Sequence, residues 1–203
     1  MGQFVRSSVL AIAMLLIAGI AHGGQKPSAE LKTDKAVLNA VVSLQCQGAD
    51  RGKVMLSSKP LVPDSTKEAL PPHAISNDQM ADLISRTRGT EELPKGIACP
   101  RVHMVAYARI KAAFDLPAKH PMEFPIPLGV LIPIGANTGF KDTFPDIKIL
   151  LRLSMPAYSP TKDMAIVYFS EDCGGLCAHG EYVFLQLVNG SWRVTKRLQA
   201  WTS

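Results

Sequence analysis

The residues best suited to chemistry lie close together near the C-terminus, between Ser170 and Tyr182. Cys173 and Cys177 are separated by three residues, and His179 follows two positions later. Thiolates and an imidazole are ligands that zinc and copper prefer, and two closely spaced cysteines can also exchange a disulfide. The stretch therefore supports two chemical hypotheses, a metal site formed by Cys173, Cys177 and His179 or a thiol-redox site.

The same stretch has a structural interpretation, which we favour. In an oxidising compartment an even number of cysteines is normally paired. The chain has four cysteines, at positions Cys46, Cys99, Cys173 and Cys177. The short spacing favours a disulfide between Cys173 and Cys177, which leaves Cys46 to pair with Cys99. Three glycines can supply the positive φ angles of a tight loop, and these are Gly174, Gly175 and Gly180.

The N-terminus has the pattern of an export signal. Arg6 precedes an apolar run from Val9 to Ile20, and small residues follow from Ala21 to Gly24. The run is too short to span a bilayer, and this order is typical of a cleaved secretory signal. We therefore predict a Sec-type signal peptide over 1–23 and a single domain over 24–203. The protein is expected to be a periplasmic or secreted bacterial protein, with no stable membrane span after cleavage.

The charge pattern argues against a nucleic-acid partner. The chain has 22 Lys and Arg residues against 17 Asp and Glu residues, a net charge of +5. The excess is spread along the sequence, without the basic blocks of a nucleic-acid-binding arm. Arg193, Thr195 and Arg197 alternate on the last predicted strand and are expected to form a basic stripe there. A charged edge strand explains that stripe without an anionic partner.

The first half of the chain predicts two helices. Apolar residues at helical spacing between Val37 and Leu44 predict a helix over about 34–46, with Thr33 or Asp34 as its cap. Val54 to Leu56 predicts a short strand. A second helix, between Ser76 and Gly89, has stronger end signals. Ser76 and Gln79 form a capping box at its start, and Gly89 ends it. Arg86 and Arg88 are expected to be solvated charges.

The segment from Arg101 to Ile110 is ambiguous between strand and helix. Its apolar residues alternate with polar ones, which favours a strand, although the alanines that follow also suit a helix.

The last quarter of the chain predicts a β-meander. Four runs, DIKILLRLSM, MAIVYFS, EYVFLQLV and SWRVTKRLQAW, are alternating or rich in β-branched and aromatic residues. Asn189-Gly190 between the last two runs is a strong hairpin signal. The fold class predicted is α+β, with N-terminal helices packed on an antiparallel sheet whose last four strands form a meander.

The C-terminal sequence resembles that of a known group of proteins. The strand, the C-G-x-x-C-x-x-G loop from Cys173 to Gly180 and the hairpin ending in N-G-x-W-x-V resemble a group of uncharacterised exported bacterial proteins. The three strands that close on Trp192 and Trp201 are also similar to the end of nuclear-transport-factor-2-like and cystatin-like folds. This resemblance implies helices packed on a curved sheet, often around a ligand pocket, and it implies no activity.

No motif specifies a reaction. The chain lacks the nucleophile elbow, the P-loop and the zinc-peptidase motif, so whether it is an enzyme stays open. The function predicted is a non-catalytic binding or interaction module of the cell envelope, without a cofactor, with a pocket between helices and sheet. Its partner would be an unknown small molecule or an envelope protein. The alternative is a thiol-redox or copper- or zinc-handling protein that uses Cys173 and Cys177.

Overall fold

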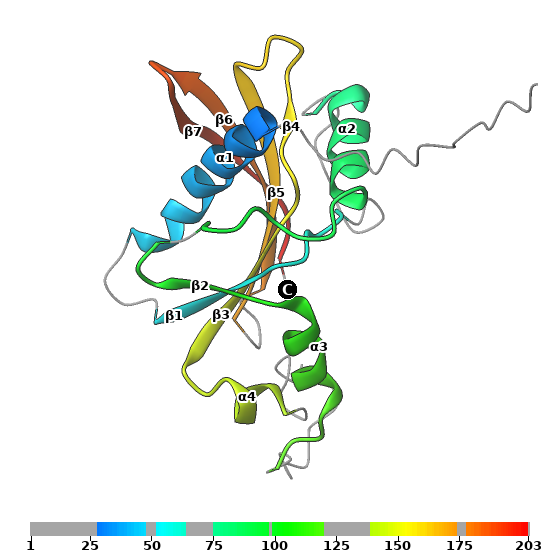
Figure 1. The fold of residues 1–203 in the computed structure, drawn as a ribbon, viewed down its shortest axis with the longest axis vertical. Coiled ribbons are helices and arrows are strands. Elements are labelled where there is room, and N and C mark those ends of the chain that lie inside the picture. The colour runs from blue at the N-terminus through cyan, green and yellow to red at the C-terminus, as the bar shows by residue number, and fades with distance from the viewer. Residues whose placement is uncertain are drawn as a thin grey trace, which may run out of the picture.

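A computed structural model describes residues 28–47, 52–63, 75–97, 99–119, 139–173 and 178–202 (Figure 1). The predicted signal peptide, residues 1–23, lies outside these ranges. Four helices are described, α1 Ser28–Cys46, α2 Asn77–Arg88, α3 Tyr107–Asp115 and α4 Phe140–Thr143. None of the described helices is long and apolar enough to cross a membrane.

The helices pack on one mixed sheet, whose strand order is β2-β1-β3-β5-β6-β7, with β4 paired to β5 beyond the end of β3. The seven strands are β1 Lys53–Ser57, β2 Val102–Val105, β3 Ile147–Leu153, β4 Ala157–Tyr158, β5 Met164–Asp172, β6 His179–Val188 and β7 Ser191–Thr202. The predicted α+β class is therefore confirmed.

The C-terminal half of the sheet is antiparallel, and the predicted meander is confirmed. Strand β3 pairs with β5, β5 with β6, and β6 with β7, each antiparallel. Asn189 and Gly190 join β6 to β7 with φ angles of 50° and 77°. Two positive φ angles are what the favoured two-residue hairpin turn requires, and Asn-Gly adopts them at low cost.

The other half of the sheet is parallel, so the prediction of an antiparallel sheet was wrong for this half. Strand β1 pairs parallel with both β2 and β3. Parallel neighbours need long crossover connections, and here α2 lies between β1 and β2 while α3 and α4 lie between β2 and β3. The sheet is therefore divided into a parallel half and a meander.

The segment from 101 to 110 is part strand and part helix, which corrects the strand prediction. Strand β2 ends at Val105, and α3 begins at Tyr107 with Ala106 as its N-cap residue. The alternation of a strand and the periodicity of a helix both fit so short a segment. The break at Ala106 depends on packing, because Ile110 and Ala113 of α3 are buried against Met55 and Phe140.

The two faces of the sheet carry different helices. Helix α1 covers one face, where its apolar stripe packs on residues from β1, β3, β5 and β6. Helix α2 packs through Leu83 on the opposite face, against Ile166, Tyr168 and Tyr182. Figure 1 shows α1 on one side of the strands and α2 with α3 on the other. The central strands are therefore buried between helices on both faces, whereas the edge strand β7 is largely exposed.

The buried face of α1 has a polar residue at each end. The helix begins at Ser28, earlier than predicted, so Asp34 lies inside it and is not its cap. Asp34 is 0% exposed and Gln45 is 2% exposed, and between them the stripe is apolar. Positions 34 and 45 share this face because they are three turns apart. Each buried polar end must therefore find a partner on another element.

Arg86 of α2 is the partner of Asp34, so the prediction that Arg86 is solvated was wrong. Its Nη2 lies 2.7 Å from Asp34 Oδ1, and its Nη1 contacts Glu30. The hydroxyl of Tyr158 donates to the same Asp34 oxygen at 2.8 Å. The Arg86 guanidinium also lies over the Tyr158 ring, 5.1 Å from its centroid. Arg86 thus connects helices that pack on opposite faces of the sheet.

Electrostatics keep Tyr158 and Arg86 protonated in this cluster. Burial raises the pKa of Tyr158 far above its usual value, and the negative charge of Asp34 raises it further. Burial by itself lowers the pKa of Arg86, but Asp34 and Glu30 outweigh it and the pKa is raised overall. The phenol and the guanidinium therefore both remain donors to the buried carboxylate.

Removing one member of the cluster should be costly. We expect Arg86→Gln to lower the free energy of unfolding by about 3–5 kcal/mol, because it leaves the Asp34 carboxylate buried without its cation. Arg88→Gln in the same helical turn is the matched control and should change it by less than about 0.5 kcal/mol. Urea unfolding of both variants measures the difference, and equal effects would contradict the burial argument.

Candidate functional site

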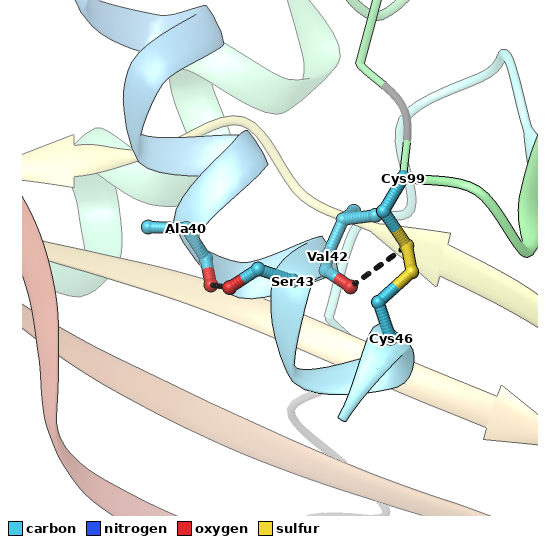
Figure 2. Close-up of a disulfide and its surroundings, with 5 residues drawn as sticks. All are labelled: Ala40, Val42, Ser43, Cys46 and Cys99. Carbon is cyan, nitrogen blue, oxygen red and sulfur yellow. Dashed lines mark hydrogen bonds between the residues drawn. A yellow bond between two sulfur atoms is a disulfide. The ribbon is translucent and has the colours of Figure 1, made fainter. Parts of the chain in front are cut away.

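Cys46 and Cys99 form the disulfide predicted for them. The bond joins the last residue of α1 to the loop before β2, across a sequence separation of 53 residues. Their Cα atoms are 6.3 Å apart, within the usual range for a disulfide. Figure 2 shows the bond against the last turns of α1, with Cys99 Sγ 3.8 Å from the carbonyl oxygen of Val42. The disulfide anchors α1 to the parallel half of the sheet.

Cys173 follows the end of β5 and takes part in a disulfide bond. It packs against the core beneath α1. Its expected partner Cys177 lies outside the described residues, as do Gly174 and Gly175. The pairing of Cys173 with Cys177 therefore remains a prediction.

His179, the third predicted ligand, faces two carboxylates. Its Nε2 lies 3.3 Å from Glu181 Oε1 and 4.0 Å from Glu171 Oε2. Glu171 is only 6% exposed and accepts from Gln45 Nε2 at 3.0 Å. Glu181 in turn accepts two hydrogen bonds from Arg197, at 2.6 and 2.9 Å. His179 thus belongs to a polar network that includes the second buried polar residue of α1.

This arrangement gives no direct support to the metal hypothesis. Within the described ranges, no group of three His, Cys, Asp or Glu side chains is placed to hold a metal ion. The sulfur of Cys173 is in a disulfide, and a disulfide sulfur is not the thiolate that zinc or copper binds. A metal site of Cys173, Cys177 and His179 stays a prediction about the reduced protein.

Gly180 is needed for space and not for its φ angle, which corrects the prediction made for it. It lies in β6 without a positive φ angle, at a register shift of the pairing with β7, and is paired with Trp201. A Cβ atom at Gly180 would lie 2.1 Å from Trp201 Nε1 and 2.6 Å from the Tyr168 hydroxyl. The indole N–H donates to that hydroxyl at 2.7 Å. The glycine therefore leaves the space that the indole ring and the Tyr168 hydroxyl occupy.

The predicted basic stripe on the last strand was wrong. The pairing of β7 with β6 slips by one residue at Thr195. Arg193 consequently pairs with Gln186 and Arg197 with Val183, an odd number of residues apart, so the two arginines face opposite sides of the sheet. A β-bulge of this kind also interrupts the exposed edge of the sheet.

A cavity that the sequence did not predict lies at the carboxyl ends of β1 and β2, where α3 begins, and it is open to solvent, since of its lining residues only Ser58 is buried. Its volume is about 360 Å³. Its lining residues are Ser58, Lys59, Glu91, Glu92, Ala106, Tyr107 and Ala108. The volume is in the range of small-molecule sites, which start at about 300 Å³.

Backbone contacts hold the walls of this cavity together. The N–H of Ser58 donates to the carbonyl of Val105 at 2.9 Å, which ties the ends of β1 and β2. The N–H of Leu93 donates to the carbonyl of Ser58 at 2.7 Å and brings in the segment after α2. The Ser58 hydroxyl is buried, accepts from the Tyr107 N–H at 3.1 Å and lies 3.5 Å from Glu92 Oε1.

Two smaller or less complete hollows were also found. One, beside Cys173, has a volume of about 10 Å³, which is room for about one water molecule. Another, of about 300 Å³, is lined by residues between Leu116 and Thr143, whose intervening segment 120–138 lies outside the described residues. The cavity at β1 and β2 is therefore the better candidate for a binding site.

Comparisons with protein-family models, with curated proteins and with solved structures found no match to this chain. The resemblance of the C-terminal hairpin to exported bacterial proteins, and to nuclear-transport-factor-2-like folds, remains a prediction. Any function must therefore be argued from the geometry of the described residues.

The two predicted disulfides should differ in their effect on stability. Replacing Cys46 and Cys99 by Ser should lower the free energy of unfolding by about 4 kcal/mol, because their bond closes a long loop. Replacing Cys173 and Cys177 by Ser should lower it by only about 2 kcal/mol for a short loop. Chemical denaturation of both double variants tests this, and a larger loss from the short loop would contradict the loop-length argument.

The close contact at Gly180 predicts a strong coupling with Trp201. Gly180→Ala should lower the free energy of unfolding by about 1–3 kcal/mol through overpacking. In a Trp201→Leu background the same change should cost much less. Gly190→Ala is the control, since nothing lies within 4 Å of a Cβ there and its cost should not depend on Trp201. A double-mutant cycle by thermal unfolding measures the coupling, and additive effects would refute it.

Proposed function

We propose that this protein is a non-catalytic binding protein of the bacterial cell envelope, and that it binds a small polar molecule in the cavity at the carboxyl ends of β1 and β2. The observation that carries the proposal is the lining of this cavity. Charges of both signs surround an aromatic ring in a hollow of about 360 Å³. Small-molecule sites combine an apolar surface with a few convergent polar groups in this way.

The position of the cavity in the fold also supports binding. In sheets with parallel strands, ligands commonly bind beyond the carboxyl ends of those strands, where the connecting loops leave the sheet. Here Ser58 and Lys59 follow β1, and Ala106 follows β2. The N-terminal end of α3 opens on the same space, and the partial positive charge at a helix N-terminus attracts anionic groups. Side chains from three connecting segments, those that follow β1, α2 and β2, thus line one cavity.

The side chains in the cavity favour binding over catalysis. The Ser58 hydroxyl is a candidate nucleophile in the cavity lining. It accepts the N–H of Tyr107 and so positions the start of α3. No histidine or cysteine lines the cavity within the described residues. The disulfide between Cys46 and Cys99 supports a location outside the reducing cytosol.

Binding in this cavity can be tested with a blocking variant. Ala108 lines the cavity and is exposed, so Ala108→Trp should fill it without disturbing the core. Ala112→Trp, also exposed and one turn further along α3, is the matched control. A library of small polar metabolites is screened by thermal shift on the wild type, and each hit is then measured on both variants.

A true ligand should stabilise the wild type and Ala112→Trp by about 2.7 kcal/mol at 100 times its Kd, and should leave Ala108→Trp unchanged. A hit that stabilises all three proteins equally would place its site elsewhere. If no compound stabilised the wild type, the proposed function would be wrong.

A further inference from the structure

From the same cavity we infer the chemical class of the ligand, a zwitterionic amino-carboxylate such as a free amino acid or a short peptide. This inference rests on the proposed function, that the cavity binds a small molecule. Two sets of groups in the lining carry it. One set is acidic and lies on the segment after α2, and the other is positive and lies after β1 and at the start of α3.

The acidic groups are Glu91 and Glu92. Both are exposed, and neither forms an ion pair with another residue in the part of the chain that the structure describes. Glu92 has one polar contact, the Ser58 hydroxyl at 3.5 Å. Two adjacent carboxylates without a cation are suited to an ammonium group, which has three donors to distribute between them.

The positive groups are Lys59 and the N-terminus of α3. The Lys59 ammonium lies over the Tyr107 ring, 4.9 Å from its centroid, and has no carboxylate partner among the described residues. Helix α3 has nine residues, and its N-cap residue Ala106 has no side chain that could accept a hydrogen bond. The N–H of Ala108 in its first turn has no acceptor among the described residues. These donors suit a carboxylate.

The two sets line one cavity, yet they do not neutralise each other, since no Lys59 to Glu91 or Glu92 pair comes within the 4.0 Å of a salt bridge. A simple anion would leave the two carboxylates without a partner, and a simple cation would leave the Lys59 ammonium without one. A molecule with an ammonium and a carboxylate a few ångströms apart satisfies both sides at once. The Tyr107 ring, which is 42% exposed, is available to its apolar part.

The test compares molecules that differ in one charge. Isothermal titration calorimetry on the wild-type protein uses L-alanine, L-leucine, L-phenylalanine and L-alanyl-L-alanine as probes. The N-acetyl derivative of each probe lacks the positive charge, and the C-terminal amide lacks the negative charge. At least one free zwitterion should bind, and each of its two derivatives should bind at least tenfold more weakly.

Variants then assign the two ends. Lys59→Gln should weaken binding of the zwitterion at least tenfold while leaving binding of its amide unchanged. Glu92→Gln should weaken the zwitterion to the same degree while leaving its N-acetyl derivative unchanged. Lys95→Gln, at an exposed lysine outside the cavity lining, is the matched control and should bind like the wild type.

The outcomes separate the inference from the function on which it rests. If an amide or an N-acetyl derivative binds as tightly as its zwitterion, the ligand class is wrong. The class is also wrong if no amino-carboxylate binds but a library compound of another class does so in a manner that Ala108→Trp abolishes. In both cases the binding function stands. If no compound of any class binds, both proposals fail.

Discussion

The fold depends on how one buried carboxylate is neutralised. Asp34 is fully buried within α1, and burying an unpaired charge would cost more free energy than a domain of this size can spare. Arg86 and Tyr158 supply its partners from two other elements. This requirement sets the position of α1 on its face of the sheet and the position of the last turn of α2 at the same time. Arg86 contacts both Asp34 and Glu30, one helical turn apart on α1, so a shift of α1 by one turn would break at least one of these ion pairs.

The same constraint reaches the candidate site. Helix α2 ends at Arg88, only two residues after Arg86, and Glu91 and Glu92 follow directly. The segment is then held to the end of β1 by the hydrogen bond from Leu93 to Ser58. Glu91 and Glu92 are therefore positioned by the contact of α2 with α1. Lys59 and the start of α3 are positioned by the ends of the parallel strands. The cavity belongs to the parallel half of the sheet, where loops leave side by side.

At its other end, α1 is held by the disulfide and by a second polar network. Gln45 binds Glu171, and His179, Glu181 and Arg197 continue the chain of contacts to the edge strand. Of the residues whose types best suit chemistry, His179 belongs to this network, and Cys173 lies two residues after Glu171. In the described structure the His179 ring faces carboxylates, as a residue that satisfies buried polar groups would. Metal binding by Cys173 would require its reduced form, whereas Cys173 does not line the cavity at β1 and β2.

The sequence by itself determined the features that arise between near neighbours. The predicted N-cap at Ser76 is present, with the Ser76 hydroxyl accepting the N–H of Gln79, although the Gln79 side chain contacts that hydroxyl and so does not complete the capping box. The Asn189-Gly190 turn forms as predicted. The end of α1 at Cys46 and the meander followed from periodicity in the same way. These signals are local, because caps, turns and side-chain alternation depend on residues a few positions apart. Cysteine count and spacing sufficed for the pairing of Cys46 with Cys99.

Only the tertiary structure decided the features that depend on residues far apart in the chain. Arg86 and Arg88 look alike in sequence, yet Arg88 is exposed whereas the Arg86 side chain is only 15% exposed, because it contacts Asp34, 52 positions away. A one-residue bulge separated Arg193 from Arg197, and Trp201 explained Gly180. The cavity combines three loops whose proximity follows from parallel pairing, which no local pattern encodes. Long-range packing chose among alternatives that were locally equivalent, and it thereby created the candidate site.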